Sequence, residues 1–273
     1  MKRKFSARVL ISTTSFLTIL KRVALFFLLL TIGWSVYKIF IYKLLLGDRL
    51  DRFFAFILLW IICAYILIPI IHRILTKLYI PNYFIGRIRT VEGLLSDPVN
   101  LAFISSEDKI HQAMQSAGWH LAEKLTLKSG FWTIISAIRH KGYISAPVSP
   151  GYLFNKKQNF TYQQNIENKP FARHHVRFFK VPNGWLMPGG YKVDWLAAGT
   201  FDKSIGLSYY TLQITHHITS DTDIERDYII KTIKETNKTK KINIIENYFS
   251  AYHHRNGGGD SISTDGALPI IEL

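Results

Sequence analysis

Two long apolar runs dominate the first quarter of the chain and constrain its fold most strongly. They cover about residues 23–42 and 53–71, and the second contains no charged side chain. A helix needs roughly 20 apolar residues to cross a hydrocarbon core of about 30 Å. Lys38 lies near one end of the first run, where its ammonium group can reach the interface. The pattern predicts a hairpin of two transmembrane helices, with a short loop between them.

Two other interpretations of these runs are less favoured. The first run is longer than the apolar core of a signal peptide, and no clear small-residue cleavage site follows it. We therefore expect a retained anchor. The remaining alternative is a buried core hairpin of a soluble protein.

Positive charge is concentrated at the N-terminus. The whole chain has a formal net charge of +15, and residues 1–52 hold ten basic side chains against two acidic ones. A basic leader over 1–22 is attracted to anionic lipid headgroups. The soluble part has no basic run with interleaved aromatic residues, so no nucleic-acid partner is expected. Basic residues outweigh acidic ones on both outer flanks of the hairpin more than in its loop, so both termini are predicted to be cytoplasmic.

One cysteine, Cys63, is the only thiol in the chain, and it lies within the second apolar run. No intramolecular disulfide can form. Thiol catalysis and cysteine zinc sites are excluded from the part that follows the membrane segments.

The rest of the chain is predicted to be a connector over 72–95 and one α+β domain over 96–273, with a mainly antiparallel sheet. Ser105 or Ser106 can cap a helix that ends at Gly118. Further helices are expected over 130–140 and 222–234. Strands are expected over 99–104, 173–181, 195–200, 213–218, 242–252 and 267–273.

Six of the ten histidines form adjacent pairs: His174-His175, His216-His217 and His253-His254. Neighbours in a strand point to opposite faces. His175 should therefore share a face with Arg173 and Arg177, and His174 should lie on the other face. The third pair, beside Arg255, is expected to be solvated.

Carboxylates near these pairs make them candidates for chemistry. Asp202 is expected in a turn after the strand that begins at 195, while Asp223 follows the second pair. Histidines with carboxylates can bind a metal or transfer protons. The catalytic candidates are His174, His175, His216, His217, Asp202, Asp223 and Asp265.

An anion site is the alternative, because arginines beside histidines can hold a phosphate or carboxylate. Arg177, Arg226 and Asp260 are the ligand-binding candidates. Structural interpretations remain open: Asp221 or Ser220 and Asp223 suit a helix N-terminus through capping alone, and the glycine-rich loop lacks a phosphate-binding pattern. No cofactor and no metal can be named.

The residues from 97 to 273 resemble the LssY C-terminal-domain family of bacterial proteins. The motifs that carry the resemblance, in chain order, are DPVNLAFI (97–104), AGWH (117–120), APVSPGYLF (146–154), RHHVRFF (173–179), WLAAGTFD (195–202), ITHHITSDTDIERDYI (214–229) and GGGDSISTDG (257–266).

In related proteins this domain is often fused to DedA-like or type 2 phosphatidic acid phosphatase membrane regions. The phosphatase motifs are absent here, so that activity is not carried over. The resemblance implies a multi-pass inner-membrane protein that presents an accessory or ligand-binding domain, with membrane lipid enzymes as candidate partners. The rival hypothesis is a membrane-tethered hydrolase that uses the His/Asp/Arg cluster on a phosphate- or lipid-containing substrate.

Overall fold

The computed structural model describes residues 23, 26–27, 30–31, 33–38, 40–80, 85–123, 126, 147–166, 169–249 and 255–273. The chain divides into two compact units, Met1–Cys63 and Ala64–Leu273. The helix expected over 130–140 and the pair His253-His254 lie outside the described residues.

The second apolar run forms one continuous helix. It consists of α2 (Arg49–Ile62), the π-helical turn η1 (Cys63–Leu67) and α3 (Ile68–Tyr79). The Asp48 carboxylate caps its start by accepting a hydrogen bond from the Asp51 N–H at 2.8 Å. Within the described residues, one helix, Arg49–Leu78, is long and apolar enough to cross a membrane. The two-helix hairpin therefore stays a prediction.

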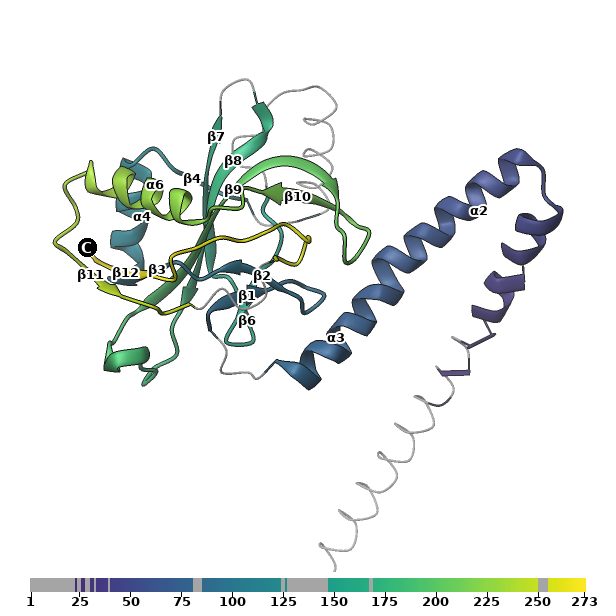
Figure 1. The fold of residues 1–273 in the computed structure, drawn as a ribbon, viewed down its shortest axis with the longest axis horizontal. Coiled ribbons are helices and arrows are strands. Elements are labelled where there is room, and N and C mark those ends of the chain that lie inside the picture. The colour runs from purple at the N-terminus through teal and green to yellow at the C-terminus, as the bar shows by residue number, and fades with distance from the viewer. Residues whose placement is uncertain are drawn as a thin grey trace, which may run out of the picture. The chain divides into compact units, whose positions relative to one another are not determined.

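Most strands belong to one eight-stranded sheet, shown in Figure 1. Its order is β11 (Lys241–Ile245), β12 (Leu268–Glu272), β3 (Leu101–Ile104), β9 (Trp195–Leu207), β8 (Lys169–Lys180), β7 (Phe160–Ile166) and β4 (His120–Leu121), with β10 (Ile214–Ile218) paired to β9. Only β3 and β12 are parallel among these described strands. The smaller sheet has the order β2 (Leu95–Pro98), β1 (Arg87–Arg89), β5 (Tyr152–Leu153) and β6 (Lys156–Lys157).

Two helices, α4 (Glu107–Ser116) and α6 (Asp223–Lys234), pack beside each other in the domain (Figure 1). Ser106 caps α4, as expected, by accepting a hydrogen bond from the Lys109 N–H. Each helix buries an apolar stripe at helical spacing in one core cluster. The fully buried members of that cluster from the two helices are Ile110, Ala113, Met114, Ile229 and Ile233.

The expectation of a mixed α+β domain with a mainly antiparallel sheet is confirmed, with corrections in detail. Asp202 lies inside β9 and not in a turn, because this strand continues to Leu207. The strand expected over 242–252 ends at Ile245. The strand β7 was not predicted, because the continuous run of Gln and Asn in its second half gives a weak apolar signal.

The long strand β9 changes partner along its length. Its first part pairs with β3, through Leu101 and Ala197, and its last part pairs with β10. Between them the Asn100 side chain takes the place of a strand, because it donates to the Gly199 carbonyl and accepts from the Gly199 N–H, both at 2.9 Å. The sheet therefore forks near Gly199, and polar side chains gather beside this fork.

Gly199 also provides a packing prediction. A Cβ at this position would collide with the Cδ1 of Ile229, which is fully buried on α6. We expect Gly199→Ala to lower the free energy of unfolding by about 1–3 kcal/mol, because overpacking forces the helix away from the sheet. Thermal unfolding of the full chain in detergent measures it. The double variant Gly199→Ala/Ile229→Val, which removes the colliding methyl, should recover much of the loss; no recovery would contradict this explanation.

Candidate functional site

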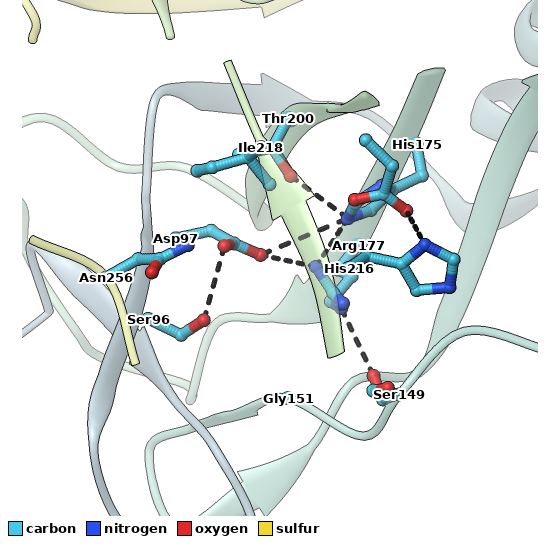
Figure 2. A network of polar contacts seen from close by, with 12 residues as sticks. Ser96, Asp97, Ser149, Gly151, His175, Arg177, Thr200, His216, Ile218 and Asn256 are labelled. Carbon is cyan, nitrogen blue, oxygen red and sulfur yellow. Dashed lines mark hydrogen bonds and ion pairs between the residues drawn. The ribbon is translucent and has the colours of Figure 1, made fainter. Parts of the chain in front are cut away.

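A cavity of about 430 Å³ lies beside the fork in the sheet. We call it the charged pocket. Strands β2, β8, β9 and β10 contribute its ionisable core, which consists of Asp97, Arg173, His175, Arg177, Asp202 and His216. Figure 2 shows part of this network.

The side chains of β8 supply one wall by alternation. Arg173, His175 and Arg177 all line the pocket, which confirms that they share a face. The Arg177 guanidinium contacts the Asp97 carboxylate and the His175 Nε2, the latter at 2.7 Å (Figure 2). Its Nε also donates to the Ser149 carbonyl at 3.3 Å. One arginine thus joins β8, β2 and the loop before β5.

His175 is 2 % exposed, and its contacts define its tautomer. A guanidinium can only donate, so Nε2 accepts from Arg177 and the proton must lie on Nδ1. The Thr200 hydroxyl also lies 3.0 Å from Nε2. Nδ1 is 3.4 Å from the Asp202 carboxylate without forming an aligned hydrogen bond. The His175 ring therefore lies between the Thr200 hydroxyl and the Asp202 carboxylate, and its Nδ1 is left without a hydrogen bond.

Asp202 is a buried carboxylate surrounded by basic groups. Its Oδ2 accepts a hydrogen bond from Arg173 Nε at 3.0 Å and lies 3.8 Å from His216 Nδ1. Burial alone would raise its pKa, but His175, His216 and Arg173 hold the pKa of Asp202 well below its usual range. Asp202 is thus ionised at neutral pH and stabilises positive charge beside it.

His216 lies on β10, on the same pocket wall as Ile214 and Ile218. Burial lowers its pKa to about 4, against the opposing attraction of Asp202. The ring is neutral at pH 7 and can act as a hydrogen-bonding partner. It is a poor general base at that pH, because efficient proton transfer needs a pKa nearer the working pH.

Three buried polar atoms of the pocket make no hydrogen bond within the described part of the chain. They are Thr90 Oγ1, His175 Nδ1 and His216 Nδ1. Buried polar groups are nearly always hydrogen-bonded. Their concentration in one cavity is typical of a site that binds a polar molecule.

His174 and His217 are not part of this cluster. His174 hydrogen-bonds Glu225 at 2.7 Å and stacks on Tyr228, with ring centroids 4.2 Å apart. His217 pairs separately with Asp260 at 2.7 Å, and the Asp260 carboxylate also accepts from the Ile218 N–H. The residue pairs that are adjacent in sequence are therefore separated, because neighbours in a strand point to opposite faces.

Arg226, Asp223 and Asp265 form another separate group, at the start of α6. Arg226 donates to Asp265 at 2.6 Å, to Asp227 at 2.8 Å and to Asp223 at 3.2 Å. Burial would lower the pKa of Arg226, but these hydrogen bonds raise it above its usual value. Asp221 caps the helix by accepting from the N–H groups of residues 223 and 224. This arrangement fits the structural interpretation of the sequence.

Several pocket residues were not among the sequence candidates. Arg173 could have been found from its alternation with His175 and Arg177. Asp97 lies eighty residues before Arg177, so only the fold brings them together. Arg73 and Thr90 lie outside the predicted domain and carry no motif.

No group of three or more His, Cys, Asp or Glu side chains among the described residues has an arrangement that could hold a metal ion. The charged pocket instead offers arginine and histidine donors. Its chemistry therefore suits the binding of an anion by charge-assisted hydrogen bonds.

The fold and the site define a class of protein: an α+β domain that is built around a forked, mainly antiparallel sheet and contains a buried arginine–histidine–aspartate network. The family described as LssY C-terminus matches residues 77–268. The chain belongs to this family. No curated protein and no solved structure shows a significant match to the chain.

Proposed function

We propose that this chain is a membrane-anchored protein whose LssY C-terminal domain binds a small ligand that carries a phosphate or carboxylate group. The charged pocket is the observation that carries the proposal. Arginines, histidines and polar atoms that lack hydrogen bonds converge there in one cavity.

The charge balance of the cavity supports an anionic ligand. Four arginines line it, Arg73, Arg89, Arg173 and Arg177, against three carboxylates. Asp97 and Asp202 are already paired with Arg177 and Arg173. Arg73 is exposed on α3 and makes no hydrogen bond or ion pair in the described residues, so its guanidinium is available to a ligand.

Arg73 provides the direct test. We expect Arg73→Gln to weaken binding of inorganic phosphate or glycerol phosphate about tenfold or more, because a hydrogen bond to a charged group contributes about 1.5–3 kcal/mol. Calorimetric titration of the full chain in detergent measures the affinity. Lys77→Gln is the matched control, since Lys77 is an exposed cation one turn further along α3 that does not line the charged pocket. Equal affinities for wild type and Arg73→Gln would refute this anion site.

A hydrolase is the second candidate, and one observation favours it. Thr200 Oγ1, His175 and Asp202 stand in the order of a nucleophile, a base and an orienting carboxylate. Against it, Thr200 is 1 % exposed and is not among the residues that line the cavity. Phosphate release from a phosphorylated lipid by wild type, lost in Thr200→Val, would favour the hydrolase. No release would leave the binding function.

The membrane arrangement is part of the proposal. We place two spans, about 23–42 and 53–71, in the bacterial inner membrane, with both termini cytoplasmic and an accessory role beside membrane lipid enzymes. The one long apolar helix and the basic flanks support it. A reporter fused after Leu273 should behave as cytoplasmic. A periplasmic signal would reverse the orientation.

A further inference from the structure

The hairpin that joins β9 to β10 has an unusual tip. Over residues 205–214 its outward side chains are apolar: Ile205, Leu207, Tyr209, Tyr210, Leu212 and Ile214 are all exposed. Tyr209 is 74 % exposed and Ile214 is 62 % exposed. The polar side chains point inward, with Ser208 and Thr211 buried. We call residues 205–214 the apolar tip.

Polar groups inside the tip form hydrogen bonds with one another. The Ser208 hydroxyl accepts hydrogen bonds from the N–H groups of Tyr210 and Thr211, and the Ser208 N–H donates to the Gln213 carbonyl at 2.8 Å. On a surface that faces water, polar side chains are normally exposed and apolar ones are more often buried. A continuous exposed apolar surface usually marks an interaction site. Hydrogen bonds inside the apolar tip thus hold its exposed apolar surface in place, and this surface requires a nonpolar partner.

Hydrogen bonds identify where that surface lies. Gln213 donates from its side chain to the Ala64 carbonyl at 2.8 Å, within the π-helical turn. In a π register this carbonyl would accept from residue 69, and Pro69 has no N–H to give. An unpaired carbonyl is costly in hydrocarbon. Gln213 thus satisfies a helix carbonyl inside the apolar segment.

Two further contacts continue along the same helix. The Ile214 N–H donates to the Tyr65 hydroxyl at 3.4 Å, and His72 Nε2 donates to the Tyr210 carbonyl at 3.1 Å. The tip is therefore fixed to residues 64–72, a stretch whose other side chains include the exposed Ile66, Leu67, Ile70 and Ile71. The tip must share the environment of this stretch.

We propose that the apolar tip inserts into the lipid bilayer, in the leaflet that holds the C-terminal part of the Arg49–Leu78 helix. Tyr209 and Tyr210 suit the boundary between headgroups and hydrocarbon, where aromatic residues with a polar end gather. The inference rests on the proposed membrane anchor. It also specifies the ligand: the charged pocket is lined by Tyr65, Pro69 and Thr211, so its entrance would face phosphate-bearing lipid headgroups.

Spin labels can test the insertion. The full chain with Cys63→Ala would carry one of Leu212→Cys, Ile70→Cys or Ile224→Cys, in vesicles of phosphatidylethanolamine and phosphatidylglycerol. Ile224 is a matched exposed aliphatic residue on α6, 69 % exposed. Oxygen concentrates in hydrocarbon, while a nickel chelate stays in water. We expect the oxygen-to-nickel accessibility ratio at position 212 to be severalfold higher than at position 224 and close to that at position 70.

Each outcome has one meaning. A high ratio at position 70 with a low ratio at 212 overturns the insertion and leaves the anchor intact. A low ratio at both positions overturns the anchor as well. Shielding of position 212 from both reagents shows that a second copy of this chain covers the tip and also overturns the lipid proposal. If Leu212→Cys fails to fold, Tyr209→Cys gives the same readout.

A second experiment distinguishes a lipid headgroup from a soluble phosphate as the ligand of the charged pocket. Vesicles that contain phosphatidic acid should compete with inorganic phosphate for the pocket, and Leu212→Asp should weaken the vesicle competition severalfold while binding of free phosphate stays unchanged. Equal loss of both would refute an entrance at the membrane. Binding of free phosphate alone would show that the ligand is soluble.

Discussion

Arg173→Met should destabilise the domain by about 3–5 kcal/mol, because it leaves the Asp202 carboxylate buried without its hydrogen-bonded cation. Arg173 also donates to the Gln163 side chain at 3.0 Å. Thermal or denaturant unfolding of the full chain in detergent measures the change. A loss of this size is a large fraction of the stability of a typical domain.

The double variant Arg173→Met/Asp202→Asn is the internal control for this result. It removes the buried charge together with its partner, so we expect a clearly smaller loss than in the single variant. Arg226→Met offers a second comparison. Its partners Asp227 and Asp265 are more than half exposed, so water can solvate them, and Asp223 keeps its hydrogen bonds from the Thr264 hydroxyl and the Asp265 N–H. The loss should therefore be about 1–2 kcal/mol. Equal losses of stability in Arg173→Met and Arg226→Met would contradict the explanation that burial of the partner carboxylate determines the size of the loss.

Acidification should destabilise the protein between about pH 6.5 and pH 4. His216 has a folded-state pKa of about 4, while in the unfolded chain it titrates near 6.5. In this window the unfolded state binds more protons, so stability rises with pH and falls on acidification. After solvent screening we expect about 2 kcal/mol to be lost between pH 7 and pH 4.5.

The His216→Asn variant isolates this effect. It cannot take up the proton, so its melting temperature should depend less on pH over the same window. Asp202 acts in the same direction at lower pH: its folded-state pKa is depressed, so its stabilising charge is lost only as the pH falls below its unfolded value, near 4. An identical pH dependence in wild type and His216→Asn would show that His216 is not buried in a neutral form.

The sequence alone determined the family of the protein, the α+β class of its domain and much of its local structure. A strand of alternating residues already placed Arg173, His175 and Arg177 on one face, because the side-chain period of a strand is two. The cap at Ser106 and the long apolar helix were also visible, because capping residues and runs of about twenty apolar residues have local physical causes.

Tertiary structure decided which of the candidate residues act together. It joined Asp97 to Arg177, and it placed Asp202 inside a strand beside His175. It separated His174 and His217 from them, since each is paired with another carboxylate. Pairing across a sheet depends on register between distant segments, and no local pattern in the chain specifies that register.

The apolar tip of the β9–β10 hairpin also separates what the sequence determines from what only the fold decides. Its apolar residues are visible in the sequence, yet alternation alone would assign them to a core. Only the fold shows that Ser208 and Thr211 point inward while Tyr209 and Leu212 remain exposed. The sequence thus determined that this protein has a membrane helix candidate and an α+β domain. The tertiary structure decided where charge is buried and where apolar surface is left exposed, because burial is a property of packing between distant residues.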